Sequence, residues 1–151
     1  RGLGDVYKRQ LPLVSFIDTP GAELSPQAEE GAIAGEIARC IGQMSTIRVP
    51  SVSILLGQGC GGGALALLPA ARIVATENAW LSPLPPEGAS AIMHGDIDHA
   101  AQLAAAQRIS AFDLRELGVV HRLIAEDDND TPETLAHAVA AEVGGQLREL
   151  G

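Results

Sequence analysis

Apolar and polar residues alternate in short blocks along the chain, and the spacing within each block predicts strands and helices in turn. Short apolar runs rich in β-branched residues predict buried strands at residues 13–17, 49–56, 73–76 and 119–124. Apolar residues that recur every three or four positions predict helices at residues 25–44, 64–68, 98–108, 110–117 and 131–147. Because strands alternate with helices, we expect crossover connections in a largely parallel sheet, and therefore an α/β fold.

Helix boundaries and turns have their own signals. Ser25 and Thr131 are each followed by proline, the pattern of an N-cap with proline at the first helical position. Gly118 is expected to end the helix that precedes it. The first and last predicted helices carry apolar stripes of Ile33, Ile37, Ile41 and Met44, and of Leu135, Val139, Val143 and Leu147. Turn-forming residues predict loops at 18–21, 57–63, 83–88 and 127–130.

The composition supports one globular domain and narrows its function. The 151 residues are 46% hydrophobic, enough for a sizeable core, and 3% aromatic. A net charge of −9 argues against binding to nucleic acid, whose phosphates such a surface repels. No apolar run reaches the ~20 residues that a membrane span needs. Cys40 and Cys60 form neither a CxxC pair nor zinc spacing, so we expect a reduced, cytoplasmic protein without a metal.

Residues 1–10 differ in character from the rest of the chain. They are polar and basic, and they stop abruptly where the first strand pattern begins. Because the stretch from Asp5 to Gln10 resembles a translated sequencing adaptor, we interpret residues 1–10 as a non-native tail. A natural flexible tail is the alternative. We expect residues 11–151 to form one domain that lacks its N-terminal part, so that the chain is a fragment.

The strongest chemical signal is a pair of strand-to-helix junctions at residues 17–22 and 57–64, both built from small residues. At the start of a helix the backbone N–H groups have no partner within the helix, and the helix dipole adds positive potential. Residues without bulk let a ligand approach the main chain closely. The five glycines within residues 57–63 therefore favour an oxyanion-binding site, although tight packing of helix on sheet is the alternative.

Other chemical signals in the sequence are weaker. Gly57, Gly59 and Gly62 match a dinucleotide fingerprint with Glu77 twenty residues on, but Pro69 leaves the helix too short for that fold. A nucleophile elbow at Cys60 would need glycine where Gln58 stands. We expect Asp18 to cap its own turn. The histidines have no evident partners, and we expect structural or surface roles for them at positions His94, His99, His121 and His137.

With these residues in hand, the chain resembles the alpha subunit of the bacterial acetyl-CoA carboxylase carboxyltransferase. Residues 16–22 (FIDTPGA) are similar to that family's most recognisable stretch, and residues 57–66 (GQGCGGGALA) to its glycine-rich oxyanion segment. Residues 86–90 (PEGAS) resemble its later Pro-Glu-Gly loop. Residues 109–124 resemble a helix that ends in glycine and returns to a strand in crotonase relatives.

The resemblance implies a crotonase-like fold of repeated β-β-α units. It also implies transfer of a carboxyl group from carboxybiotin, presented on its carrier protein, to acetyl-CoA, which gives malonyl-CoA for fatty-acid synthesis. By similarity, an oxyanion hole is formed by backbone N–H groups of Gly62, Gly63 and Ala64. Substrate contacts are implied for Pro20, Gly21, Ala22, Gly59, Gly61, Glu87 and Gly88. The implied partners are a beta-type subunit or fused half, within a hetero- or homo-oligomer.

Two other functions stay open at this point. Another crotonase-fold enzyme, an acyl-CoA hydratase or decarboxylase, would need an acidic side chain in the site, with Glu23, Glu77 and Glu87 as candidates. A non-catalytic assembly subunit would use the alanine-rich helix faces only for contact with other subunits.

Overall fold

A five-stranded parallel sheet forms the centre of the computed structural model, which describes residues 10–21, 25–26 and 30–151. Its order is β1-β2-β3-β5, and the short strand β4 pairs with the end of β2. The strands are β1 (Leu13–Thr19), β2 (Ser51–Cys60), β3 (Arg72–Thr76), β4 (Trp80–Ser82) and β5 (Arg122–Ile124). The predicted α/β class and parallel pairing are confirmed.

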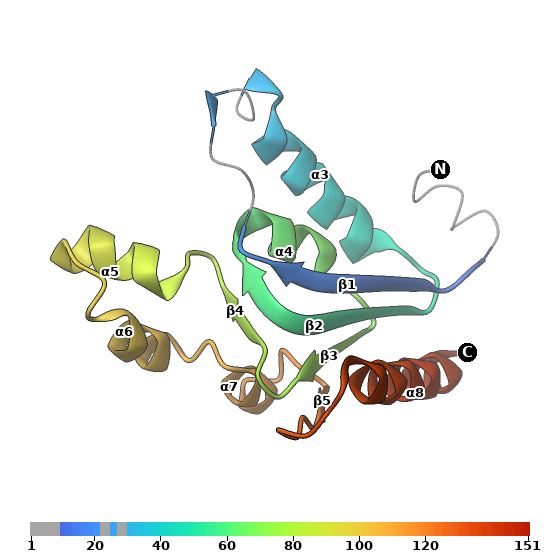
Figure 1. The fold of residues 1–151 in the computed structure, drawn as a ribbon. Helices are drawn as coiled ribbons and strands as arrows, with labels where there is room; N and C mark the ends of the chain where they lie inside the picture. The colour runs from blue at the N-terminus through green and yellow to red at the C-terminus, as the bar shows by residue number, and fades with distance from the viewer. Residues whose placement is uncertain (1–9, 22–24, 27–29) are drawn as a thin grey trace.

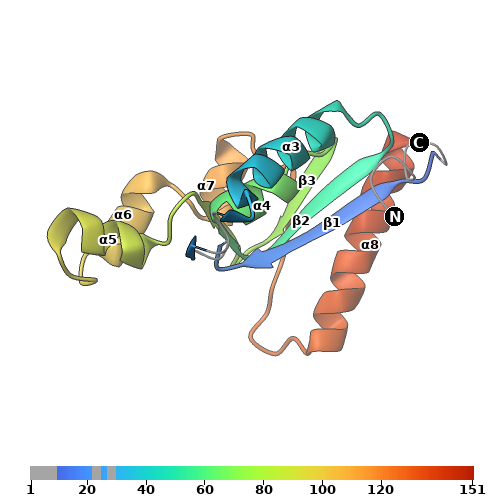
Figure 2. The same ribbon diagram turned by 90° about the horizontal axis from the view of Figure 1, so that it is seen from above.

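Helices cover both faces of this sheet (Figure 1). They are α3 (Ile33–Thr46), α4 (Gly61–Leu67), α5 (Pro86–His94), α6 (Ala100–Gln107), α7 (Ala111–Glu116) and α8 (Pro132–Leu150). Helices α3 and α4 lie on one face and α8 lies on the other, while α5 and α6 extend away from the sheet (Figures 1 and 2). Within the described residues, no helix combines the length and the apolar character needed to cross a bilayer.

Strand β2 is apolar on both sides because it lies between two cores. Leu55 is fully buried in a cluster with Ala64 of α4 and Leu114 of α7. Its neighbour Ile54 is fully buried in a second cluster on the opposite face, with Val139 of α8. Successive residues of a strand point to opposite faces, so a continuous apolar run is what burial on both sides requires.

Helix α8 follows its sequence signals closely. The side chain of Thr131 accepts a hydrogen bond from the N–H of Thr134, and the Thr134 side chain accepts one from the N–H of Thr131, which makes a capping box. Pro132 occupies the first turn, as predicted. Val139 and Val143 are buried against the sheet, and Leu135 and Leu147 pack beside them, so the predicted stripe is confirmed.

Several local predictions are wrong. The helix predicted at residues 25–44 is interrupted by a turn at residues 31–32, and the strand predicted at residues 119–124 is reduced to β5. Residues 57–60 lie in β2 rather than in a turn, and Asp18 and Thr19 lie in β1. Strand β4 has no counterpart in the prediction, and the predicted loop at 83–88 gives way to α5 at Pro86. For the strands, a pairing partner distant in sequence extends or creates the element, and such a partner leaves no local pattern.

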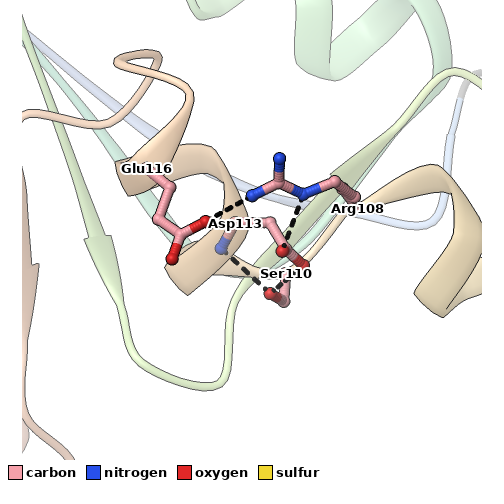
Figure 3. Close-up of polar contacts among 4 residues, drawn as sticks. All are labelled: Arg108, Ser110, Asp113 and Glu116. Atoms are coloured by element: carbon pink, nitrogen blue, oxygen red, sulfur yellow. Dashed lines mark hydrogen bonds and ion pairs between the residues drawn. The ribbon is translucent and has the colours of Figure 1, made fainter.

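A polar network fixes the corner between α6 and α7 (Figure 3). Arg108 ends α6 in the left-handed conformation, with φ 53°, which is unusual for a residue other than glycine. Its Nε donates to Asp113 Oδ1 over 3.2 Å, and its guanidinium also pairs with Glu116. Ser110 caps α7 and donates its hydroxyl to Asp113 Oδ2 over 2.6 Å. The bond from Ser110 and then the bond from Arg108 lower the pKa of the Asp113 carboxyl.

The glycines of α3 give a test of this packing. An added Cβ at Gly35 or Gly42 would meet no atom within 4 Å. Gly35→Ala and Gly42→Ala should therefore each raise the free energy of unfolding by about 0.5–1 kcal/mol, measured by urea denaturation. At Gly59 an added Cβ would lie 2.7 Å from the carbonyl oxygen of Trp80, so Gly59→Ala should be destabilising. Equal effects at all three positions would contradict the described packing.

The corner network predicts a pH dependence of stability. Since the folded-state pKa of Asp113 is lowered, its contribution is present above the unfolded value of about 3.9 and is lost as the pH falls through the folded value. Asp113→Asn should lower the urea midpoint at pH 7 and leave it nearly unchanged near pH 2. Asp128→Asn, in the exposed acidic loop, is the control. A midpoint difference that stays the same at both pH values would argue against this role of the carboxylate.

Candidate functional site

The two predicted strand-to-helix junctions meet at the carboxyl ends of β1 and β2. Strand β2 ends at Cys60, and α4 starts at the next residue, Gly61, whose φ is +68°. Gly21, which follows β1, has a φ of +125° and packs beside Cys60, since an added Cβ there would lie 3.7 Å from its Sγ. We call Gly21 together with residues 59–63 the glycine junction. Both positive φ values belong to a region that glycine adopts readily.

The first turn of α4 supplies the backbone donors. Gly61, Gly62 and Gly63 are its first three residues, and N–H groups at these positions have no acceptor within a helix. Ala64 is the fourth residue, and in a regular helix its N–H bonds to the carbonyl of the cap residue, here Cys60. The geometry therefore favours the amides of Gly62 and Gly63 over that of Ala64 as free donors.

The glycines of the junction differ in what surrounds them. An added Cβ at Gly59 would be only 2.7 Å from the Trp80 carbonyl oxygen, and one at Gly62 would be 2.8 Å from Cδ1 of Ile37. These two glycines allow close packing of β4 and α3. An added Cβ at Gly63 would meet no atom within 4 Å, so this residue faces open space. Gly63 thus leaves its α-carbon open to a ligand, whereas Gly62 is packed against α3.

The side chain of Cys60 does not serve as a nucleophile here. It is only 2% exposed, and burial raises the pKa of its thiol, which keeps the thiol protonated at neutral pH. The dinucleotide interpretation also fails on position, because Gly57 and Gly59 lie within β2 rather than in a loop between strand and helix.

A cleft of about 820 Å³ opens at the carboxyl ends of the strands, and its lining includes Pro20 and Gln58, the direct neighbours of the glycine junction in the chain. The residues of the junction itself and Ala64 do not line it. Of the predicted substrate-binding residues, Pro20 and Glu87 line it, and Gly88 follows Glu87 on α5. Ala22 and Glu23 lie outside the described residues. The remaining walls come from the turn after β3, from β4, and from α6 and α7, including Asn78, Trp80, Ala104, Ser110, Phe112 and Asp113. No pattern in the sequence indicated the walls from β4, α6 and α7.

Asp18 has a different role from the predicted one. The side-chain oxygen of Thr19, not Asp18, accepts the N–H of Gly21 over 3.2 Å in the turn after β1. Asp18 Oδ1 instead accepts the backbone N–H of Gln58 on β2 over 3.0 Å. Gln58 itself lines the cleft. The carboxylate therefore links the two strands directly beside the candidate site.

The acidic side chains at the cleft are held in different ways. Glu77 Oε2 accepts the N–H of Glu126 over 3.3 Å, and Glu126 Oε2 accepts the N–H of Asn78 over 2.7 Å. These reciprocal bonds tie the β3–β4 turn to the segment after β5. Glu87 lies exposed in the first turn of α5, where the helix dipole favours a negative charge. Glu77 thus has a structural role in this arrangement.

The histidines lie outside the cleft lining. His121 lies just before β5, not within it, and its Nδ1 accepts the N–H of Ile73 over 3.0 Å. His99 stacks on His94 with ring centroids 4.1 Å apart and contacts Asp96 through Nδ1. His137 is exposed on α8, as predicted. In the part of the chain that the structure describes, no group of three or more potential ligands could hold a metal ion.

Solved structures share this architecture. A Pseudomonas malonate decarboxylase hetero-tetramer in complex with coenzyme A matches with a TM-score of 0.80 at 17% identity, over 98% of this chain and 62% of that one. The transcarboxylase 12S structure with methylmalonyl-coenzyme A bound matches with a TM-score of 0.66 at 23% identity, over 87% of this chain and 27% of that one. At these identities the likeness shows the fold, and it confirms the predicted crotonase-like class.

Sequence comparisons go further than the fold. The chain is 50% identical over 149 residues to a "Probable biotin-dependent acyl-coenzyme A carboxylase beta3 subunit" of Mycobacterium tuberculosis, covering 95% of this chain and 30% of the relative. It is 43% identical over 126 residues to the "Acetyl-coenzyme A carboxylase carboxyl transferase subunit alpha" of Thermus thermophilus, covering 83% of this chain and 39% of the relative. The chain therefore spans well under half of either relative.

A family model described as "Acetyl co-enzyme A carboxylase carboxyltransferase-like" matches residues 4–150. The match takes in β1, the glycine junction, the cleft and α8, which include the parts from which the candidate site is built. This chain therefore belongs to the acetyl co-enzyme A carboxylase carboxyltransferase-like family.

Proposed function

We propose that this chain forms the biotin-binding half of an acyl-CoA carboxyltransferase site. The observation that carries the proposal is the open space in front of Gly63 at the start of α4, beside a cleft at the carboxyl ends of parallel strands. At the start of a helix, backbone N–H groups can donate to a small anionic oxygen, and the helix dipole stabilises its negative charge. In open α/β sheets this end of the strands is where ligands bind.

In the proposed reaction the chain stabilises charge through its main chain. Carboxybiotin is the substrate and is carried by its carrier protein. It releases CO2 when the bond between its ureido nitrogen and the carboxyl carbon breaks, and the electron pair of that bond moves onto the ureido group. The ureido oxygen then accepts hydrogen bonds from the N–H groups of Gly62 and Gly63, while the N–H of Ala64, the third member of the predicted set, bonds within α4. The freed biotin nitrogen removes the α-proton of acyl-CoA, and the resulting enolate attacks CO2. Each preorganised donor of this kind contributes about 3–4 kcal/mol to the transition state.

We propose acetyl-CoA as the acceptor and malonyl-CoA as the product. The chain resembles a relative named for acetyl-CoA, which supports this acceptor, and one named for acyl-CoA more generally. The cleft has a volume suited to part of such a ligand, and its lining by Pro20, Trp80 and Phe112 suits apolar groups. Pro20, Gly21 and Glu87 would then contact the substrates as the resemblance implies.

The proposed partners are a beta-type carboxyltransferase half and a biotin carrier protein. A relative from Saccharopolyspora erythraea is named "Acetyl-coenzyme A carboxylase carboxyl transferase subunits beta/alpha", and it is 41% identical over 147 residues. This name joins both halves in one protein, so the beta-type half could be fused or separate. The partner half would supply most contacts to coenzyme A and the donors for the enolate oxygen.

The acid-dependent alternative is less well supported by the geometry. A hydratase would need a carboxyl group free to exchange protons with its substrate. Glu77 accepts the N–H of Glu126, which in turn binds the N–H of Asn78, so the Glu77 carboxylate is already engaged in the fold. Among the described candidates, this leaves Glu87 as the exposed acid at the cleft.

Replacing Gly63 tests the proposed site directly. In the carboxyltransferase assembled with its beta-type partner, Gly63→Val should lower carboxyl transfer from carboxybiotin to acetyl-CoA by roughly 100-fold or more, because the side chain fills the space in front of the donors. The fold should persist, since a Cβ at Gly63 meets no atom within 4 Å. Product formation is measured by mass spectrometry, and folding by thermal melting.

Gly42→Val is the matched control, because it makes the same change in an exposed helix position that is equally free of contacts. It should leave transfer unchanged. Full activity of Gly63→Val in a folded, assembled complex would favour the assembly-subunit interpretation over catalysis. A wild-type assembly that transfers no carboxyl group with any beta-type partner would also count against the proposal.

A further inference from the structure

On the side away from β1, strand β2 changes its partner just before it reaches the glycine junction, since its residues 52–55 pair with β3 and its residues 58–60 pair with β4. Strand β1 stays paired with β2 on the near side, but the pairing is irregular there. The two strands pair in regular register up to Ile17 opposite Leu55, and the next pair is Thr19 opposite Gly59. Residues 56–58 of β2 therefore stand opposite Asp18 alone. On the opposite edge of β2, residues 58–60 pair with β4, where Gln58 lies opposite Trp80. Such a bulge bends a strand and redirects the residues that follow it.

The Asp18 side chain spans the irregularity. Its Oδ1 accepts the N–H of Gln58 over 3.0 Å, and so takes the place of a backbone acceptor in the β1–β2 ladder. The residue before Gln58 leaves room for this contact. An added Cβ at Gly57 would lie 2.9 Å from the same oxygen, so the carboxylate rests against the bare backbone of that glycine.

We infer that Asp18 is a positioning residue for the glycine junction. By holding the N–H of Gln58, its carboxylate fixes the bend of β2 three residues before α4 begins at Gly61. The direction of the first turn of α4, and with it the direction of the Gly63 N–H, follows from this bend. Gln58 also lines the cleft, so the same bond fixes one of the cleft walls. The inference rests on the proposed function of this site.

This role is local, because the rest of the sheet has its own support. Asp18 is exposed, whereas Ile17 and Leu55 beside it are buried in the core and hold β1 against β2. The pairing of β2 with β4 continues through Gly59 and Cys60. Loss of the carboxylate should therefore loosen the bend without unfolding the domain.

Two substitutions at Asp18 separate positioning from charge. In the assembled enzyme, Asp18→Ala should lower kcat by about tenfold to a hundredfold, because displaced donors stabilise the transition state less well. The KM for acyl-CoA should rise by less than kcat falls, because Gln58 is one of many residues that line the cleft. Asp18→Asn keeps an oxygen that can accept the Gln58 N–H, so it should restore most of kcat. Asp128→Ala, in the acidic loop far along the chain, is the control for loss of one negative charge.

Hydrogen–deuterium exchange gives a readout that does not need activity. Peptides covering residues 57–63 should exchange faster in Asp18→Ala than in the wild type or in Asp18→Asn. Gly57→Ala adds a further check, because its new methyl group would collide with the Asp18 carboxylate. Introduced alone, Gly57→Ala should lower kcat. Introduced together with Asp18→Ala, it should add little to the loss of kcat that Asp18→Ala causes by itself.

The outcomes distinguish the positioning role from the proposed function. Wild-type kcat and wild-type exchange in Asp18→Ala would overturn the positioning role. Equal loss of kcat in Asp18→Ala and Asp18→Asn, with unchanged exchange, would also overturn it, since charge rather than position would then matter. A wild-type assembly without carboxyl transfer would remove the proposed function, and the exchange result would still decide whether Asp18 holds the bend.

Discussion

The structure depends on one abrupt transition, in which the chain passes from an extended strand directly into a helix between Cys60 and Gly61. Cys60 is extended, with φ −108° and ψ 138°, and Gly61 takes a φ of +68°. With no loop between the two elements, the first turn of α4 lies at the very end of β2. Backbone N–H groups of α4 that have no helical acceptor are thereby held at the end of a strand whose residues 51–55 are buried. A site built in this way needs no ionisable side chain, in keeping with the protonated thiol of Cys60.

Rigidity at this point comes from both sides of the sheet. Ile54 and Leu55 bury their side chains in opposite cores, so β2 cannot shift without disturbing α4 on one face or α8 on the other. The bond between Asp18 and Gln58 links β2 to β1 where their register is irregular, and on its other edge β2 pairs there with β4. Preorganised donors stabilise a transition state most when they do not reorganise, and this arrangement meets that condition.

Much of this could be predicted from the sequence, and the exceptions have a common cause. The strands at residues 13–17 and 73–76 and the helix after Thr131 have local patterns, and the structure confirms them. Two junctions of small residues were also evident from the sequence, but the structure was needed to bring Gly21 beside Cys60. Strand β4 and the strand conformation of residues 57–60 depend on partners elsewhere in the chain. The identity of Asp18 as a strand-linking residue was missed for the same reason, because its acceptor role depends on a bulge that no spacing reveals.

The central claim is that the N–H of Gly63 is free and faces a space that a ureido oxygen can enter. The most direct measurement is a crystal structure of the assembled carboxyltransferase with biotin bound. We predict that the ureido oxygen lies within about 3 Å of the Gly63 nitrogen, the distance of an N–H···O hydrogen bond. Biotin bound elsewhere, with the Gly63 N–H donated to an acceptor within the protein, would contradict the account.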